Sequence, residues 1–252
     1  MNSYHQLRQA CLVESTRPFN ARGKSVVRCE LCQLAQKACL CTFRPEQKIN
    51  CEFILLMHRD ELFKPTNTGR LIADVFPDQT RTFCWTRTEP DKSLLELLSD
   101  PSRIHLLVFP DDSVEGSQRR KSTLVELNEK FLLENTEKII SFILLDATWK
   151  QSARMFHLSH WLDQVSCLSL PDVTTKNYAV RKSHLETYLS TAEAAALCLD
   201  LVGQDQSADV LRDYFHLFNL HYLATRGGYT PEITDVHQRM SAFIQMAETK
   251  SP

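Results

Sequence analysis

Apolar runs alternate with helical patterns along most of the chain. Five short runs are predicted to be strands: 51–58, 81–85, 104–110, 138–146 and 165–171. Several of them are so uniformly apolar that they leave no face for solvent. Uniformly apolar strands are typical of a largely parallel sheet that is covered on both faces. The segments 67–76, 93–100 and 123–133 show helical spacing, and Thr123-x-x-Glu126 forms a capping box at the start of the last one. The pattern therefore predicts an α/β fold.

After residue 172 the pattern becomes helical, with segments at 190–202, 208–226 and 233–248. No long linker, repeat or low-complexity tract interrupts the chain. At 252 residues and 43% hydrophobic composition, the chain can bury a substantial core. We predict two parts: an N-terminal segment, 1–48, and a main domain, 49–252, which contains the sheet and the C-terminal helices.

The charge is unevenly distributed, although the formal net charge is only −2. Residues 1–50 contain eight Lys or Arg and three Asp or Glu, so they carry +5 and the remainder carries −7. A basic N-terminal segment on an otherwise acidic protein is compatible with a nucleic-acid partner but does not require one. No apolar stretch approaches the roughly 20 residues that span a bilayer, and the N-terminus lacks the apolar core of a signal peptide. We therefore expect a soluble, cytoplasmic protein that does not bind membranes.

Four of the nine cysteines form the array Cys29-x2-Cys32-x6-Cys39-x-Cys41, whereas the other five are scattered. Two closely spaced pairs of thiolates can bind one ion tetrahedrally. Zinc is the predicted ion, but an iron–sulfur cluster uses the same donors and the spacing does not exclude it. Unliganded thiols are the simpler alternative. Because protein would fill all four positions, such a metal would be structural.

The stretch "FILLDATWKQSARM", 142–155, places an acid, a hydroxyl and an indole directly after a strand. Thr148-x-x-Gln151 forms a capping box, so a helix is expected to begin at Trp149. Asp146 then lies at the carboxyl edge of the sheet, where parallel α/β proteins place their binding crevice. In the alternative interpretation, Asp146 only stabilises the helix dipole and Trp149 packs in the core.

Two further polar segments are weaker signals. "HRDELFKPTNTGRL", 58–71, ends at a helix start that could bind an anion, although a solvated loop explains the segment better. "YAVRKSHLETYLSTAEAA", 178–195, contains Ser190-x-x-Glu193, which an ordinary helix cap explains.

Taken together, these motifs resemble a known family. The cysteine array is followed in order by "LLMHRDELFKPTNTGRLIADV", "LVFP", "LLDATW" and "LSTAEA". This order is similar to that of the DTW-domain family, named for an Asp-x-Thr-Trp tetrapeptide, and specifically to its bacterial tRNA-uridine aminocarboxypropyltransferases. The resemblance runs from about Cys29 to beyond Glu193.

The resemblance implies a SPOUT-like fold with a knotted cofactor site, which would be a rare exception to unknotted topology. It also implies transfer of the 3-amino-3-carboxypropyl group of S-adenosylmethionine to N3 of a tRNA uridine in the variable loop. In that reaction Asp146 is the candidate base, because partial desolvation would raise its pKa. Thr148 would hold the loop and contact the donor, and Trp149 would stack on adenine or on a flipped base.

The resemblance also suggests a donor pocket. Arg181 would bind the donor carboxylate through its guanidinium. The other expected donor residues come from strand ends and from the segment before 195: Phe109, Pro110, Leu145, Leu189, Ser190, Thr191 and Glu193.

Expected tRNA contacts lie mainly in two basic segments, and they would bind phosphates by shape without reading sequence. They are Arg17, Arg22, Lys24, Arg28, His58, Arg59, Lys64, Asn67, Thr68 and Arg70. Each of them taken singly is also explained as a solvated surface charge. The stretch 115–122, "EGSQRRKS", is a second basic candidate.

Two other functions fit parts of the same sequence. A SPOUT-type RNA methyltransferase would share the donor and the fold. A zinc-containing RNA-binding protein without catalytic activity would use only the cysteine array and the basic N-terminal segment. The sequence leaves open the target uridine, the metal, the oligomeric state and the role of the last helix.

Overall fold

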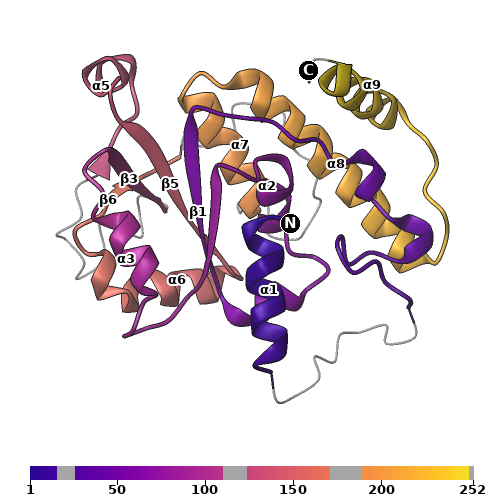
Figure 1. The fold of residues 1–252 in the computed structure, drawn as a ribbon, viewed down its shortest axis with the longest axis horizontal. Coiled ribbons are helices and arrows are strands. Elements are labelled where there is room, and N and C mark those ends of the chain that lie inside the picture. The colour runs from indigo at the N-terminus through magenta and orange to yellow at the C-terminus, as the bar shows by residue number, and fades with distance from the viewer. Residues whose placement is uncertain (16–25, 110–123, 171–188, 250–252) are drawn as a thin grey trace.

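A computed structural model describes residues 1–15, 26–109, 124–170 and 189–249. Within these ranges the strands form one six-stranded sheet in the order β2-β1-β5-β3-β6-β4, and every neighbouring pair is parallel (Figure 1). The strands are β1 (Cys51–Met57), β2 (Thr80–Cys84), β3 (Arg103–Val108), β4 (Leu124–Val125), β5 (Ile139–Asp146) and β6 (Ser166–Leu168). The predicted α/β class and the predicted parallel sheet are both confirmed.

The helices are α1 (Ser3–Val13), α2 (Gly69–Val75), α3 (Lys92–Leu98), α5 (Glu129–Glu134), α6 (Trp149–Leu158), α7 (Thr191–Leu201), α8 (Asp205–Gly227) and α9 (Asp235–Thr249). All five predicted strands and the helices predicted at 67–76, 93–100 and beyond 190 are present. Helix α6 begins at Trp149 behind the Thr148–Gln151 capping box, as predicted. No helix in the described ranges is long and apolar enough to cross a membrane.

The prediction of a helix over 123–133 is wrong for the first half of that range. Leu124 and Val125 pair with β6 as the edge strand β4, and α5 begins only at Glu129. The side chain of Asn128 accepts a hydrogen bond from the Phe131 N–H and is the N-cap that the structure uses. Pairing with β6 therefore overrides the local helical pattern before Asn128, and Thr123 lies outside the described residues.

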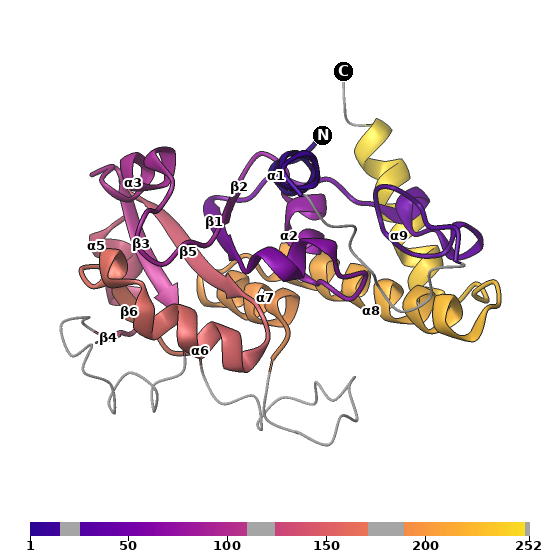
Figure 2. The same ribbon diagram turned by 90° about the horizontal axis from the view of Figure 1, so that it is seen from below.

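Alternating side chains of the central strands form two cores, one on each face of the sheet. Phe53 and Leu55 of β1 pack in a large cluster with residues of α1, α2, α7 and α8, whereas Ile54 and Leu56 pack with residues of α3 and α6. Figure 2 shows α6 and the pair α7–α8 as separate layers. Because both faces are covered, the central strands need apolar residues at every position.

The described residues before position 49 pack closely against the main domain. Tyr4 of α1 is fully buried, and its hydroxyl donates to the Leu62 carbonyl oxygen at 3.0 Å. Leu34 and Leu40 are also fully buried, and they belong to the same apolar cluster as the central strands. The division of the chain at residue 48 stays a prediction.

Strands β1 and β5 lie side by side and end together, with Met57 opposite Asp146. The chain leaves β1 through α2 on one face and leaves β5 through α6 on the other face. A parallel sheet opens into a crevice where successive connections diverge to opposite faces. Asp146 therefore lies at the switch point of this sheet.

Candidate active site at the carboxyl edge of the sheet

The Asp146 carboxylate is the best-defined polar group at this edge. It is the last residue of β5, and the residue is only 3% exposed. Asn67 donates from Nδ2 to Asp146 Oδ2 at 2.7 Å, and the Thr191 hydroxyl donates to Asp146 Oδ1 at 2.8 Å. The strand end, the loop before α2 and the start of α7 thus meet at one carboxylate.

Gly69 allows α2 to approach this carboxylate. A Cβ atom at position 69 would lie 2.1 Å from Asp146 Oδ2, which is closer than non-bonded atoms can come. The Asn67 amide oxygen accepts the Arg70 N–H at 3.0 Å, so Asn67 presents its amide nitrogen to the carboxylate. The glycine and the asparagine of "TNTG" therefore have separate roles: one leaves room and the other donates.

Burial raises the pKa of Asp146 from its ordinary value of 3.8 to about 6. The hydrogen bonds from Asn67 and Thr191 stabilise the ionised form and counteract part of this increase. At neutral pH the carboxylate is therefore mostly ionised, yet its pKa is close enough to neutrality for it to accept a proton efficiently.

Thr148 and Trp149 lie at the rim of the crevice. The Gln151 Oε1 atom accepts hydrogen bonds from the Thr148 N–H at 3.1 Å and from the Thr148 hydroxyl at 2.6 Å. Trp149 is 36% exposed, and its ring centroid is 6.5 Å from that of Phe109. Phe109 is buried and stacks on Phe156 with 4.2 Å between centroids. Trp149 therefore lies next to buried aromatic rings and is itself partly exposed to solvent.

A second aromatic pair follows the ends of β1 and β2. The rings of His58 and Trp85 are stacked, with 6.3 Å between centroids and an interplanar angle of 19°. The Trp85 indole N–H donates to the Ser159 hydroxyl at 2.7 Å, and the Gln151 side chain lies 3.3 Å from His58 Nδ1. Sequence reasoning missed Trp85, although an aromatic residue directly after a strand was the available signal.

The residues expected to bind the donor S-adenosylmethionine are not all brought together at Asp146. Of the three polar side chains at the start of α7, that of Thr191 bonds to Asp146. Ser190 and Glu193 form the helix cap, in which the Ser190 N–H donates to a Glu193 carboxylate oxygen at 2.8 Å. Leu145, next to Asp146 on β5, is half-buried. Pro110 and Arg181 lie outside the described residues.

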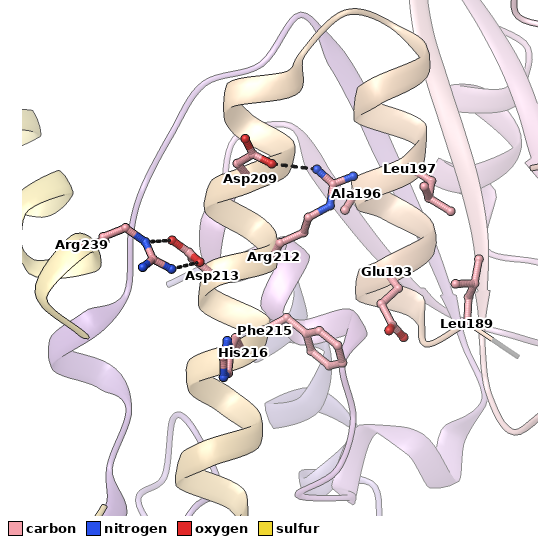
Figure 3. A pocket seen from close by; sticks show the side chains of 10 residues that line it. All are labelled: Leu189, Glu193, Ala196, Leu197, Asp209, Arg212, Asp213, Phe215, His216 and Arg239. Carbon is pink, nitrogen blue, oxygen red and sulfur yellow. Dashed lines mark hydrogen bonds and ion pairs between the residues drawn. The ribbon is translucent and has the colours of Figure 1, made fainter. Parts of the chain in front are cut away.

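A separate cleft of about 520 Å³ lies between α7, α8 and α9 (Figure 3). Leu189 and Glu193 line it at the α7 end. Its arginines are already neutralised, because Arg212 bonds to Asp209 and Arg239 binds both carboxylate oxygens of Asp213. Asp146 is not among the described residues that line this cleft.

Several expected tRNA contacts are buried. Arg70 is fully buried, with its guanidinium 5.1 Å from the centre of the Phe218 ring, and Asn67 and Thr68 are also buried. A direct contact between Arg70 and RNA does not fit this placement, because α2 packs between the sheet and α8. Arg17, Arg22, Lys24 and the stretch 115–122 lie outside the described residues.

Other expected contacts already have protein partners. Lys64 lies 2.5 Å from a carboxylate oxygen of Glu61, and Arg59 lies 3.7 Å from one of Glu14. Arg28 donates to the Gln33 carbonyl oxygen at 2.9 Å. His58 is the expected contact that lies closest to the rim, where its main-chain N–H donates to the Asp146 carbonyl oxygen at 3.0 Å.

The structure brings the sulfur atoms of Cys29, Cys32, Cys39 and Cys41 together, all within 4.8 Å of one another. The Cys29–Cys41 and Cys32–Cys39 sulfur distances are 3.6 and 3.8 Å. Four sulfurs at about 2.3 Å from one tetrahedral ion would be about 3.8 Å apart. The four thiols therefore fit a single metal ion.

The fold and the site define an all-parallel α/β protein with a buried carboxylate at its switch point. The DTW domain matches residues 26–223, and the chain belongs to the DTW-domain family. The tetrapeptide Asp146–Trp149 that gives the family its name is the end of β5 and the start of α6.

Eukaryotic curated relatives match the chain, whereas the sequence motifs suggested bacterial members. The chain is 25% identical to "tRNA-uridine aminocarboxypropyltransferase 2" of Mus musculus over 182 residues, which is 70% of this chain and 57% of the relative. It is 24% identical to the protein of the same name from Drosophila melanogaster over 192 residues, covering 73% of this chain and 68% of that one. The chain thus spans little more than half the length of the mouse relative. No solved structure matches.

Proposed function

We propose that this protein is a tRNA-uridine aminocarboxypropyltransferase. It transfers the 3-amino-3-carboxypropyl group of S-adenosylmethionine to N3 of a uridine in the tRNA variable loop. The observation that carries the proposal is the Asp146 carboxylate of the DTW tetrapeptide, buried at the switch point with a pKa of about 6. The names of the relatives supply the reaction class.

Asp146 acts as the general base in this proposal. Uridine N3 is a poor nucleophile while it carries its proton, and Asp146 removes that proton as the new N–C bond forms. Among the described residues, each carboxylate oxygen accepts one side-chain hydrogen bond, which leaves a further lone pair for the substrate. The bound donor supplies an electrophilic carbon next to its sulfonium, and the breaking C–S bond leaves its electron pair on sulfur in methylthioadenosine.

Asn67 and Thr191 position the base. Asn67 donates to one oxygen of Asp146 and Thr191 to the other, so a rotation of the carboxylate disturbs both hydrogen bonds. Holding the base in one orientation matters because the donor carries more than one electrophilic carbon, and the nucleophile must meet the correct one.

The donor pocket is proposed to lie in a knotted SPOUT-like site at the same edge. Phe109 lies next to Trp149, and Leu145 packs against the same apolar cluster as Phe109; both are proposed contacts of the adenine ring, and the Thr191 hydroxyl supplies a polar group. Arg181 and Pro110 remain proposed donor contacts from outside the described residues.

We also propose that the four cysteines hold a structural zinc ion. The sulfur spacing supports one tetrahedral ion more than a cluster in which the thiolates bind different iron atoms. The basic residues that precede this site in the sequence, Arg17, Arg22, Lys24 and Arg28, are proposed to contact tRNA phosphates.

Incubating the protein with S-adenosylmethionine and unmodified tRNA tests the function. We expect methylthioadenosine release and, in digested tRNA, a uridine that is heavier by one aminocarboxypropyl group. A methylated nucleoside would instead identify the methyltransferase alternative. Binding of tRNA with no change in nucleoside mass would identify a non-catalytic RNA-binding protein.

A further inference from the structure

Helix α6 presents a cationic face immediately beside the proposed site. Lys150, Arg154 and His157 are exposed, and their spacing of four and three residues places them on one side of the helix. The buried residues Ser152 and Phe156 point to the opposite side. We name the surface formed by Lys150 and Arg154, with His157 next to them, the α6 cationic face.

The charges at the start of α6 do not stabilise the helix. Helices α5, α7, α8 and α9 each carry an acidic residue in the first turn, where it favours the helix dipole, whereas α1, α2 and α3 carry none. Helix α6 has no acidic residue anywhere and carries Lys150 in its first turn. Lys150 and Arg154 are also like charges one turn apart, which disfavours the helix. Local stability therefore does not explain this arrangement.

Within the described ranges, Lys150 and Arg154 also lack the ion pairs that several other surface cations form. Among the described residues, no carboxylate lies within ion-pair distance of Lys150 or Arg154, whereas Arg59, Lys64 and Arg239 each have one. Two cations on one face without a described carboxylate partner favour an anionic ligand. Figure 2 shows α6 as an outer layer of the molecule, with its N-terminal end at the carboxyl edge of the sheet.

We propose that the α6 cationic face binds the phosphate backbone of the substrate tRNA. This inference rests on the proposed function, because it identifies the polyanion as the molecule whose base reaches Asp146. The face begins four residues after Asp146 and one residue after the exposed Trp149. A backbone held along α6 therefore delivers a flanking nucleotide to the aromatic rim and the target base to the carboxylate. Phosphate contacts of this kind set position and do not read sequence.

The double variant Lys150→Ala/Arg154→Ala tests this contact. Binding of unmodified tRNA is measured over a range of salt concentrations. We expect tRNA affinity to fall at least tenfold at low salt, and the slope of log K against log salt to fall by about one to two, since each lost phosphate contact removes roughly 0.7–0.9. In turnover, the KM for tRNA should rise while kcat at saturating tRNA stays within about twofold.

The matched control is Lys130→Ala/Lys138→Ala, which removes the same charge. Lys130 lies on α5 and Lys138 directly precedes β5, so both exposed lysines lie at the amino edge of the sheet. If the α6 variant and this control bind tRNA with the same affinity and salt slope, the proposal is overturned. A change only in self-association or in capture of an acidic protein would overturn it as well. Because binding is measured without the donor, this result stands even if the wild-type protein transfers no group, which would overturn the proposed function alone.

Discussion

The cysteine site and the Asp146 site are built in opposite ways. The four sulfurs come from a stretch of thirteen residues, Cys29–Cys41, and short turns bring them together. The carboxylate site draws on Asn67, Gly69, Asp146 and Thr191, which lie on separate elements. A local site tolerates changes elsewhere in the fold, whereas a distributed site depends on how the sheet, α2 and α7 pack. Single substitutions should therefore damage the two sites in different ways.

The largest expected effect follows from Asp146→Asn. Loss of the base should slow transfer by about 10³-fold, within the range of general base catalysis. The amide is nearly isosteric and still accepts the Asn67 hydrogen bond, while the Thr191 hydroxyl can rotate to accept one. The fold should therefore persist, and nucleoside mass spectrometry with circular dichroism measures both properties. Near-normal turnover would remove Asp146 from the role of base.

At neutral pH, Asp146→Asn should be at least as stable as the wild-type protein. The pKa of Asp146 is raised in the folded state, to about 6 from 3.8, so the folded protein binds a proton more readily between these values. Ionised Asp146 therefore lowers the free energy of unfolding above about pH 6, by up to about 3 kcal/mol. Urea unfolding should show Asp146→Asn to be equal to or more stable than wild type at pH 7, with the difference smaller near pH 4.

The next largest effect is expected from Gly69→Ala. The added methyl group would meet Asp146 Oδ2, so the carboxylate or α2 must move, and transfer should fall by about 10²-fold. Gly203→Ala is the comparison, because Gly203 has φ +69° and open space around it. That variant should lose about 1 kcal/mol of stability while transfer stays close to normal. Equal activity of the two variants would contradict the close packing of α2 on Asp146.

Cys32→Ser tests the local site. The variant should lose its bound metal, measured by elemental analysis, and its Tm should fall by several degrees because the metal stabilises only the folded state. Transfer should fall by about tenfold or less when measured below the new Tm, since Cys32 does not touch the Asp146 site. Cys84→Ser, a cysteine outside the array, should retain the metal.

The smallest effect is expected from Thr191→Val. The Thr191 hydrogen bond lowers the pKa of Asp146, so its loss should raise that pKa further above its ordinary value. In wild type, kcat/KM should rise with pH through about 6 as Asp146 ionises. In Thr191→Val the same rise should occur at higher pH, with a rate at the plateau reduced by less than about tenfold. Thr191→Ser keeps the hydroxyl and should restore the wild-type profile; identical profiles for all three proteins would exclude this contact.

The sequence predicted much of the fold because burial on both faces leaves a local signature. The runs at 51–58 and 138–146 are apolar at nearly every position, which only strands covered on both sides require. The prediction over 123–133 was wrong because Leu124 and Val125 gain hydrogen bonds from β6, a partner that their own neighbours in sequence do not reveal.

The sequence by itself determined the cysteine array, the capping boxes at Thr148 and Ser190, and the position of Asp146 at a strand end. These features depend on residues within a few positions of one another, so spacing is enough to predict them. Tertiary structure alone decided that Asn67 and Thr191 hold Asp146, that Arg70 is buried, and that Trp85 joins the rim. The order of strands and the faces covered by helices set these contacts, because packing brings together residues that are far apart in the chain.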